Sequence, residues 1–269
     1  MTAKISFRDV SCRFDAGGGN GFQALDRVAL DIGDREFVTV VGPSGCGKST
    51  LLNIAAGLVE PTGGQVLVDG RPVAGPGPDR GVVFQQYALF PWLTVRQNVE
   101  FGLRLAKVGR AERRRRAQRC IDLVGLGEFA GVLPKALSGG MRQRCAVARA
   151  YAVNPDILLM DEPFGALDAL TRVQLQDQLL QTWRAEQRTV MFITHDVDEA
   201  VYLANRVVVL TARPGRIHQT VDVDLPAPRT EEVRLSAPFA AIRNRVWHAV
   251  YHQNAHQDAH QDAGEGLSK

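Results

Sequence analysis

The stretch Gly42-Pro43-Ser44-Gly45-Cys46-Gly47-Lys48-Ser49 decides the fold of this chain, because it matches the phosphate-loop pattern G-x-x-x-x-G-K-[ST] in full. An apolar, β-branched run at 37–41 comes directly before it, and residues 50–56 are typical of a helix that stops at Gly57. This order of strand, loop and helix is the context that a phosphate-binding loop needs. The sequence therefore predicts an α/β fold.

The loop also predicts how a nucleotide would be held. Its glycines allow a tight turn that aims backbone N–H groups at phosphates, and the start of the next helix adds positive potential. We expect Lys48 to reach the terminal phosphates and Ser49 to hold Mg²⁺. The predicted ATP contacts are Gly42, Pro43, Ser44, Gly45, Cys46, Gly47, Lys48, Ser49 and Thr50.

Two adjacent carboxylates end a second apolar run. Residues 157–160 resemble a strand buried on both faces, and Asp161 and Glu162 follow directly. Because side chains alternate along a strand, we expect the two acids to point in different directions. We then expect Asp161 to bind Mg²⁺ through a water molecule or to contact the ligands of the ion, and Glu162 to polarise the attacking water. Strand ends also carry merely solvated acids, so this interpretation depends on the phosphate loop.

The segment Leu137-Ser138-Gly139-Gly140-Met141-Arg142-Gln143-Arg144 predicts a second anion-binding helix start. Ser138 is a suitable N-cap for a helix to about Ala152, and the glycines would present N–H groups there. The segment resembles the signature motif of the ATP-binding cassette (ABC) family. That resemblance implies a homodimer in which two cassettes pack head to tail, so that Ser138, Gly139 and Gly140 close on the ATP held by the other loop.

Three single residues extend the resemblance to this family. Gln85, after the strand-like run 81–84, is similar to the Q-loop glutamine, which senses Mg²⁺ and the γ-phosphate. Asp168 is similar to the D-loop aspartate at the dimer interface, and His195 to the switch histidine that contacts the γ-phosphate. The order and spacing of the whole set carry this interpretation, since an isolated glutamine or histidine means little. It implies Lys48, Glu162 and His195 as catalytic residues.

By the same resemblance, Ser49, Gln85 and Asp161 lie at the Mg²⁺ site, Asp161 through water. An adenine platform is also expected, because cassettes of this family stack an aromatic side chain on the base. Phe14 and Phe22 both lie in the right region, on either side of the glycine-rich insertion 17–21. We favour Phe14, because Phe22 begins an alternating segment and could be a core-facing strand residue.

The resemblance implies an ABC cassette with a RecA-like core, an antiparallel β subdomain and a helical signature subdomain. Strands and short helices alternate up to about Gln85 and again from 155 to 211, whereas about 94–154 is helix-like and rich in arginine. We expect a nucleotide-binding domain at 1–252 that contains this helical subdomain. Residues 253–269, which repeat a His- and Asp-containing tetrapeptide, are expected to be a disordered tail.

Composition limits the class of protein. The chain has 269 residues, a net charge of +3 and no uninterrupted apolar run long enough to span a membrane, and its first ten residues do not resemble a signal peptide. We therefore expect a cytoplasmic protein without a nucleic-acid partner, and we interpret the arginine run 113–116 as a solvated helix face. The four cysteines are scattered and expected to be reduced; Cys46, within the loop, is expected to be the reactive thiol.

A narrower resemblance concerns segments 75–85, 89–95 and 161–172, which are similar to the ATPase subunits of bacterial nitrate, taurine and alkanesulfonate importers. It spans about Ile5 to His252 and departs from the pattern at Met141, where glutamine is frequent, and in the tail repeat. It implies uptake of a small oxyanion, powered by ATP hydrolysis at the cytoplasmic face of the inner membrane.

The partners implied by this resemblance are two integral membrane permease subunits and, indirectly, a periplasmic or lipid-anchored solute-binding protein. The aromatic segment around Trp92 would border the groove for a coupling helix of the permease. Two alternatives belong to other classes: the ATPase of an exporter or lipid-trafficking complex, and a soluble non-transport ABC ATPase. Against the latter, the chain has neither the long coiled coils of repair ATPases nor the second cassette of translation ATPases.

Overall fold

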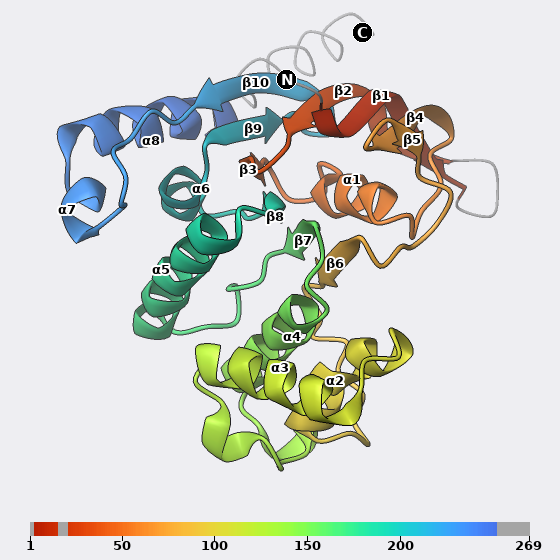
Figure 1. Ribbon diagram of the computed structural model, residues 1–269. Helices are drawn as coiled ribbons and strands as arrows, with labels where there is room; N and C mark the ends of the chain where they lie inside the picture. The colour runs from red at the N-terminus through yellow and green to blue at the C-terminus, as the bar shows by residue number, and fades with distance from the viewer. Residues whose placement is uncertain (1–2, 16–20, 252–269) are drawn as a thin grey trace, which may run out of the picture.

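The computed structural model describes residues 3–15 and 21–251, whose strands form two sheets (Figure 1). The antiparallel sheet has the strand order β2-β1-β4-β5. The larger sheet has the order β10-β9-β3-β8-β7-β6, in which all neighbours except β10 and β9 pair in parallel. The predicted α/β class is confirmed.

The strand bounds are β1 (Ala3–Phe14), β2 (Phe22–Gly33), β3 (Phe37–Val41), β4 (Gly63–Val68), β5 (Arg71–Pro72), β6 (Arg80–Val83), β7 (Ile157–Asp161), β8 (Thr189–Ile193), β9 (Arg206–Leu210) and β10 (Ile217–Asp222). The helix bounds are α1 (Lys48–Ala55), α2 (Val95–Leu105), α3 (Arg110–Leu123), α4 (Gly139–Ala152), α5 (Ala169–Glu186), α6 (Val197–Leu203), α7 (Glu231–Arg234) and α8 (Ala237–Tyr251).

Alternate residues of the parallel strands face two different apolar cores. Phe37 and Phe192 pack with side chains from α4, α5, α6 and α8, whereas Val38 and Met191 pack with α1 and the antiparallel sheet. Figure 1 shows this layering, with the larger sheet between the two groups. Because both faces are covered, the strands are continuous apolar runs without polar alternation, which is typical of parallel sheets.

All regular structure between β6 and β7 is helical in the described chain, and it projects beyond the end of the sheet (Figure 1). Helix α2 begins with a capping box between Thr94 and Gln97, and α4 begins at Ser138, whose hydroxyl accepts a bond from the Met141 N–H at 3.2 Å. The prediction of a Ser138-capped helix to Ala152 is confirmed. The proposed domain limits, 1–252 and about 94–154, stay predictions, and the 253–269 tail lies outside the described residues.

The arginine run lies on α3, and much of its charge is paired within the chain. Arg113 lies 3.3 Å from Glu100 of α2, and Arg115 and Arg116 both pair with Glu112 one turn earlier. No helix within the described ranges is both long enough and apolar enough to cross a bilayer.

One buried amide fixes the loop that joins β6 to α2. The Asn98 side chain is fully buried; it accepts a bond from the Phe90 N–H at 2.9 Å and donates to the Phe90 and Leu93 carbonyls at 3.2 and 2.9 Å. Arg149 of α4 donates to the Ala88 carbonyl at 2.6 Å and lies over the Phe90 ring. The loop is therefore ordered by contacts from two helices, although much of it is at the surface.

We expect Asn98→Ala to lower the free energy of unfolding by about 3 kcal/mol, because several buried backbone groups lose their partner at once. Urea denaturation followed by circular dichroism measures this loss. Arg114→Ala, a truncation at the exposed face of α3, serves as the control and should change stability by less than about 0.5 kcal/mol. Equal stabilities of the two variants would contradict the role assigned to Asn98.

Candidate nucleotide-binding and hydrolysis site

Four neighbouring parallel strands bring the predicted site residues to one edge of the larger sheet. The order β3-β8-β7-β6 places the phosphate loop after β3, His195 after β8, Glu162 after β7 and Gln85 after β6. Since parallel strands have their carboxyl ends at the same edge, these segments meet there, which is where open α/β sheets bind ligands.

The phosphate loop has the backbone shape of an anion cradle. Gly45 and Gly47 have left-handed φ angles of 75° and 92°, and a Cβ on Gly47 would lie only 2.8 Å from the Ala24 carbonyl oxygen. Helix α1 begins at Lys48, earlier than the predicted Thr50, and has no side-chain cap. Its first N–H groups thus need partners from outside the helix, and phosphate oxygens would supply them.

Lys48 places its cation inside this cradle. The side chain is 8% exposed, and its Nζ donates to the carbonyls of Gly42 and Pro43 at 2.8 and 3.0 Å. Its Nζ also lies 3.8 Å from Cys46 Sγ. No carboxylate of the described chain forms an ion pair with this buried ammonium, which favours a bound anion. The loop and Lys48 together fit the phosphate tail of a nucleotide.

Asp161 is the acid nearest to the loop. Its carboxylate is buried and accepts a hydrogen bond from the Ser49 hydroxyl. Burial raises the pKa of Asp161, and the neighbouring Glu162 adds to the rise, while the bond from Ser49 and the charge of Lys48 oppose it. A hydroxyl and a carboxylate in contact are oxygen ligands of the kind that Mg²⁺ prefers.

Glu162 faces a different set of partners, as predicted, but it does so because its backbone turns left-handed after the end of β7 and not because side chains alternate along the strand. Its backbone is left-handed, with φ 45°, and its N–H donates to the Ile193 carbonyl at 3.0 Å. Its Oε2 accepts a bond from Gln85 Nε2 at 3.2 Å and lies 3.3 Å from His195 Nδ1. Gln85 and His195 therefore both contact the same oxygen of the Glu162 carboxylate, although the three residues are far apart in the sequence.

Among the residues that the structure describes, no cluster of three or more His, Cys, Asp or Glu could hold a metal ion alone. Mg²⁺ often binds through one or two protein oxygens plus substrate phosphates, so the Ser49 and Asp161 pair beside the phosphate loop fits such an ion. Gln85, the third predicted residue of the metal site, here contacts Glu162 instead of Asp161 or Ser49. The roles of all these residues toward nucleotide and metal stay predictions.

The signature lies apart from the loop of its own chain. Ser138 is exposed at the start of α4, and a Cβ on Gly140 would lie 2.9 Å from Leu167 Cδ2. Asp168 is exposed and caps α5 by accepting the Thr171 N–H at 3.0 Å, which also lowers the pKa of its carboxyl. In the described chain, no hydrogen bond or ion pair joins Ser138 or Asp168 to the phosphate loop. Each chain thus presents two separate helix starts suited to anions.

Phe22 is not a core-facing residue, so the reason for preferring Phe14 as the adenine platform is wrong. The two residues are direct partners across β1 and β2, and their side chains are 44% and 42% exposed. The Arg213 guanidinium lies 5.9 Å from the Phe22 ring centroid and next to Gly45 of the phosphate loop. No sequence pattern assigned a role to Arg213. Both Phe14 and Phe22 therefore stay candidates for the platform.

The thiols also differ from expectation. Cys46 is buried, with only 1% of its surface exposed, and burial raises the pKa of its thiol. Cys12 and Cys145 are buried as well, whereas Cys120 on α3 is half-buried. Cys120 is therefore the most exposed thiol of the described chain, although burial raises its pKa as well, to about 11. The burial of Cys46 argues against the expectation that it reacts first.

The fold and the site define a phosphate-loop enzyme that uses nucleoside triphosphates. A family model described as "ABC transporter" matches residues 25–165. A protein of Brucella abortus with the provisional name of ATP-binding protein is 70% identical over 250 residues, which cover 93% of this chain and 94% of its own.

Two relatives have more specific names. A taurine import ATP-binding protein of Rhizobium johnstonii is 50% identical over 238 residues, covering 87% of this chain and 91% of its own. A nitrate import ATP-binding protein of Synechocystis is 53% identical over 203 residues, covering 76% of each chain.

Among solved structures, the chain is similar to the dimeric post-hydrolysis state of an ATP-binding cassette bound to ADP and Pi. The TM-score is 0.75 and the identity 35%, over 81% of this chain and 98% of that one. The chain therefore belongs to the ABC transporter family, has the ABC cassette fold and is an ATPase.

We expect Asp161→Asn to stabilise the nucleotide-free protein at pH 7 by on the order of 1 kcal/mol. Because burial raises the pKa of Asp161, the folded state binds a proton more tightly than the unfolded state. The ionised carboxylate thus destabilises the fold above that pKa, and the cost disappears as the pH falls through it. Urea denaturation at pH 7 and at lower pH checks both points, with the exposed Asp224→Asn as control. A less stable Asp161→Asn at pH 7 would overturn this account.

Proposed function

We propose that this chain is the ATP-hydrolysing subunit of an ABC importer that takes up a small oxyanion such as nitrate, taurine or another sulfonate. The relatives named for taurine and nitrate import support the proposal, because each is half identical or more over most of the chain. Nitrate and sulfonates share a compact, charged, oxygen-rich group. The solute is selected by other subunits, so its class is the part of the proposal that transport measurements must test.

The meeting of Gln85, Glu162 and His195 at one carboxylate oxygen is the observation that carries the proposed mechanism. Glu162 would accept a proton from the attacking water, and His195 would orient that water toward the γ-phosphate. Lys48 and the loop N–H groups would neutralise charge that develops on the phosphate. Mg²⁺, held by Ser49 and, through water, by Asp161 with Gln85 nearby, would supply further charge neutralisation when bound.

Glu162→Gln should lower the hydrolysis rate by about 10²–10³-fold while ATP binding is kept, because the amide cannot accept the proton. Single-turnover hydrolysis and equilibrium binding of ATP measure the two properties. Glu60→Gln, which neutralises an exposed acid away from this edge, should hydrolyse at the parent rate. Hydrolysis by Glu162→Gln within a few-fold of the parent would remove Glu162 from the catalytic role.

We also propose that two copies of the chain pair head to tail, so that Ser138, Gly139 and Gly140 of one copy close on ATP held by the other, with Asp168 at the interface. The exposure of Ser138 and Asp168, and their separation from the loop of their own chain, support this arrangement. The dimeric state of the similar ADP-bound cassette also supports it.

Ser138→Arg should leave ATP binding to the single chain unchanged and should reduce hydrolysis by at least about tenfold, because a bulky cation would block the paired surface. Light scattering with ATP in the Glu162→Gln background follows pairing, and nucleotide titration follows binding. Ser138→Thr keeps the capping hydroxyl and is the control. Loss of ATP binding by the unpaired Ser138→Arg chain would refute the head-to-tail arrangement.

The membrane partners in this proposal are two permease subunits, which would hold the ATPase at the cytoplasmic face of the inner membrane and receive solute from a binding protein. Trp92 supports a docking surface, since its side chain is 70% exposed on a loop that Asn98 and Arg149 keep ordered. Its ring lies 5.7 Å from that of Phe90. This exposure also excludes a core role for Trp92. Exposed aromatic groups on a fixed loop often mark a partner site.

Trp92→Ala should keep basal hydrolysis and stability but lose most solute uptake, because the proposed anchor for the permease is removed. Reconstitution with the membrane subunits from the same gene neighbourhood, in vesicles supplied with nitrate, taurine or an uncharged sugar, measures uptake. Trp247→Ala, which truncates an exposed tryptophan on α8, is the matched control. Full uptake by Trp92→Ala would refute the docking role, and uptake of the sugar alone would refute the oxyanion class.

A further inference from the structure

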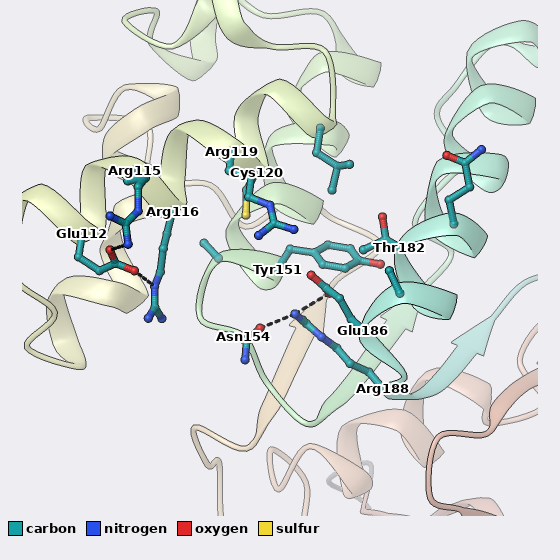
Figure 2. A pocket seen from close by; sticks show the side chains of 14 residues that line it. Glu112, Arg115, Arg116, Arg119, Cys120, Tyr151, Asn154, Thr182, Glu186 and Arg188 are labelled. Carbon is teal, nitrogen blue, oxygen red and sulfur yellow. Dashed lines mark hydrogen bonds and ion pairs between the residues drawn. The ribbon is translucent and has the colours of Figure 1, made fainter.

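A hollow of about 740 Å³ lies near the starts of β7 and β8. Figure 2 shows the side chains that line it. Three parts of the chain line this hollow. The first is α3, the second is the last turn of α4 together with the residues before β7, and the third is the last turns of α5 together with the residues before β8. Because β7 and β8 start here and end at the nucleotide site, the two regions occupy opposite ends of these strands.

Positive side chains outnumber negative ones around this hollow. Four arginines line it against two glutamates. Both glutamates form ion pairs with these arginines. Glu112 pairs with Arg115 and Arg116, and Glu186 lies 2.6 Å from Arg188 Nη2. The fourth arginine, Arg119, is exposed and forms no hydrogen bond or ion pair with any described residue.

Two buried donors at the hollow have no partner within the described chain. The Tyr151 side chain is 6% exposed and that of Arg188 is 7% exposed, yet neither the Tyr151 hydroxyl nor Arg188 Nη1 forms a hydrogen bond. The other terminal nitrogen of Arg188 donates to Asn154 Oδ1 at 2.7 Å. Burial raises the pKa of Tyr151, so its hydroxyl stays protonated and can donate. Leaving such groups unpaired is costly, and an acceptor in the hollow would remove that cost.

Figure 2 shows how these groups are arranged. The Tyr151 ring lies across the hollow with its hydroxyl directed toward Thr182 of α5, and Arg188 lies on the side of Asn154. The Arg188 guanidinium is 5.4 Å from the centre of the Tyr151 ring. Arg119 extends from α3 beside Cys120, toward the same ring. The donors thus come from three elements and converge on one space.

We propose that this hollow binds the oxyanion group, phosphate or sulfonate, of a small organic molecule. Such a group offers several acceptor oxygens, which match the fork of Arg119, the free nitrogen of Arg188 and the Tyr151 hydroxyl. The volume is within the range of small-molecule sites and exceeds what an inorganic anion fills. Leu123 and Ala185, which also line the hollow, provide apolar surface for the rest of the molecule.

The ligand would contact both the helical segment and the larger sheet, and each of these carries residues of the proposed nucleotide site. It would contact α3 of the helical segment and the start of β8 in the sheet, and it would lie against the last turn of α4. The signature residues occupy the first turn of the same helix. This site is separate from the proposed nucleotide contacts and does not depend on which solute is transported.

Cys120 provides a direct test, because it lines the hollow and is the most open thiol of the described chain. Protein saturated with ADP, so that the phosphate loop is filled, is alkylated with iodoacetamide, and labelling at Cys120 is followed by mass spectrometry. Methyl phosphate and methanesulfonate are the probes, each compared with sodium chloride at equal ionic strength. We expect at least one probe to slow labelling by about tenfold at saturation, with half the effect below about 10 mM. The probe that slows labelling more shows whether the hollow prefers a phosphate or a sulfonate group.

Variants separate binding from general screening by salt. The protection ratio is the rate of Cys120 labelling without probe divided by the rate with saturating probe. Arg119→Gln and Tyr151→Phe should each reduce this ratio several-fold, whereas Arg114→Gln, on α3 outside the hollow, should not. Without probe, Tyr151→Phe should melt at the same temperature as the parent or higher, because it deletes an unpaired donor. Equal slowing by chloride, no slowing by either probe, or full protection in both Arg119→Gln and Tyr151→Phe would each overturn the proposal.

Discussion

The parallel pairing of β3, β8, β7 and β6 is the constraint on which the site depends. Each of these strands is short and mostly apolar, and the segment that carries its site residues comes directly after it or at its last residue, so the sheet gathers those segments along one edge. The two cores above and below the sheet hold the strands in register. A one-residue slip of any strand would exchange its two faces and displace the polar residue that follows it.

Electrostatics within the site separates two neighbouring acids. Asp161 is the last residue of β7 and is buried against Ser49 near the Lys48 charge, whereas Glu162 turns away in a left-handed conformation toward Gln85 and His195. This difference in surroundings supports the proposal that Asp161 serves the cation and Glu162 the attacking water. The left-handed backbone of Glu162 is strained, and such strain is frequent at residues with a functional role.

Helix α4 connects regions with different roles. Its first turn carries the signature and its last turn borders the arginine-lined hollow, while Arg149 in between holds the loop that exposes Trp92. The proposed permease surface, the proposed dimer surface and the hollow therefore all include residues of one helix or residues held by it.

The sequence by itself determined what depends on local patterns. The phosphate loop, the order of strands and helices and the cap at Ser138 follow from glycine spacing, apolar periodicity and capping chemistry, and each of these signals lies within a few residues. The sequence also predicted different directions for Asp161 and Glu162, although the left-handed turn that causes the difference was seen only in the structure. The ABC motifs then named the family, which the comparisons confirmed.

Only the tertiary structure decided which distant side chains meet. The exposure of Phe22, the burial of Cys46 and the clamp made by Asn98 depend on how whole elements pack, and so does the placing of Tyr151 and Arg188 beside Arg119. No periodicity reports such contacts, because the partners belong to different strands and helices whose order in the sheet differs from their order in the chain.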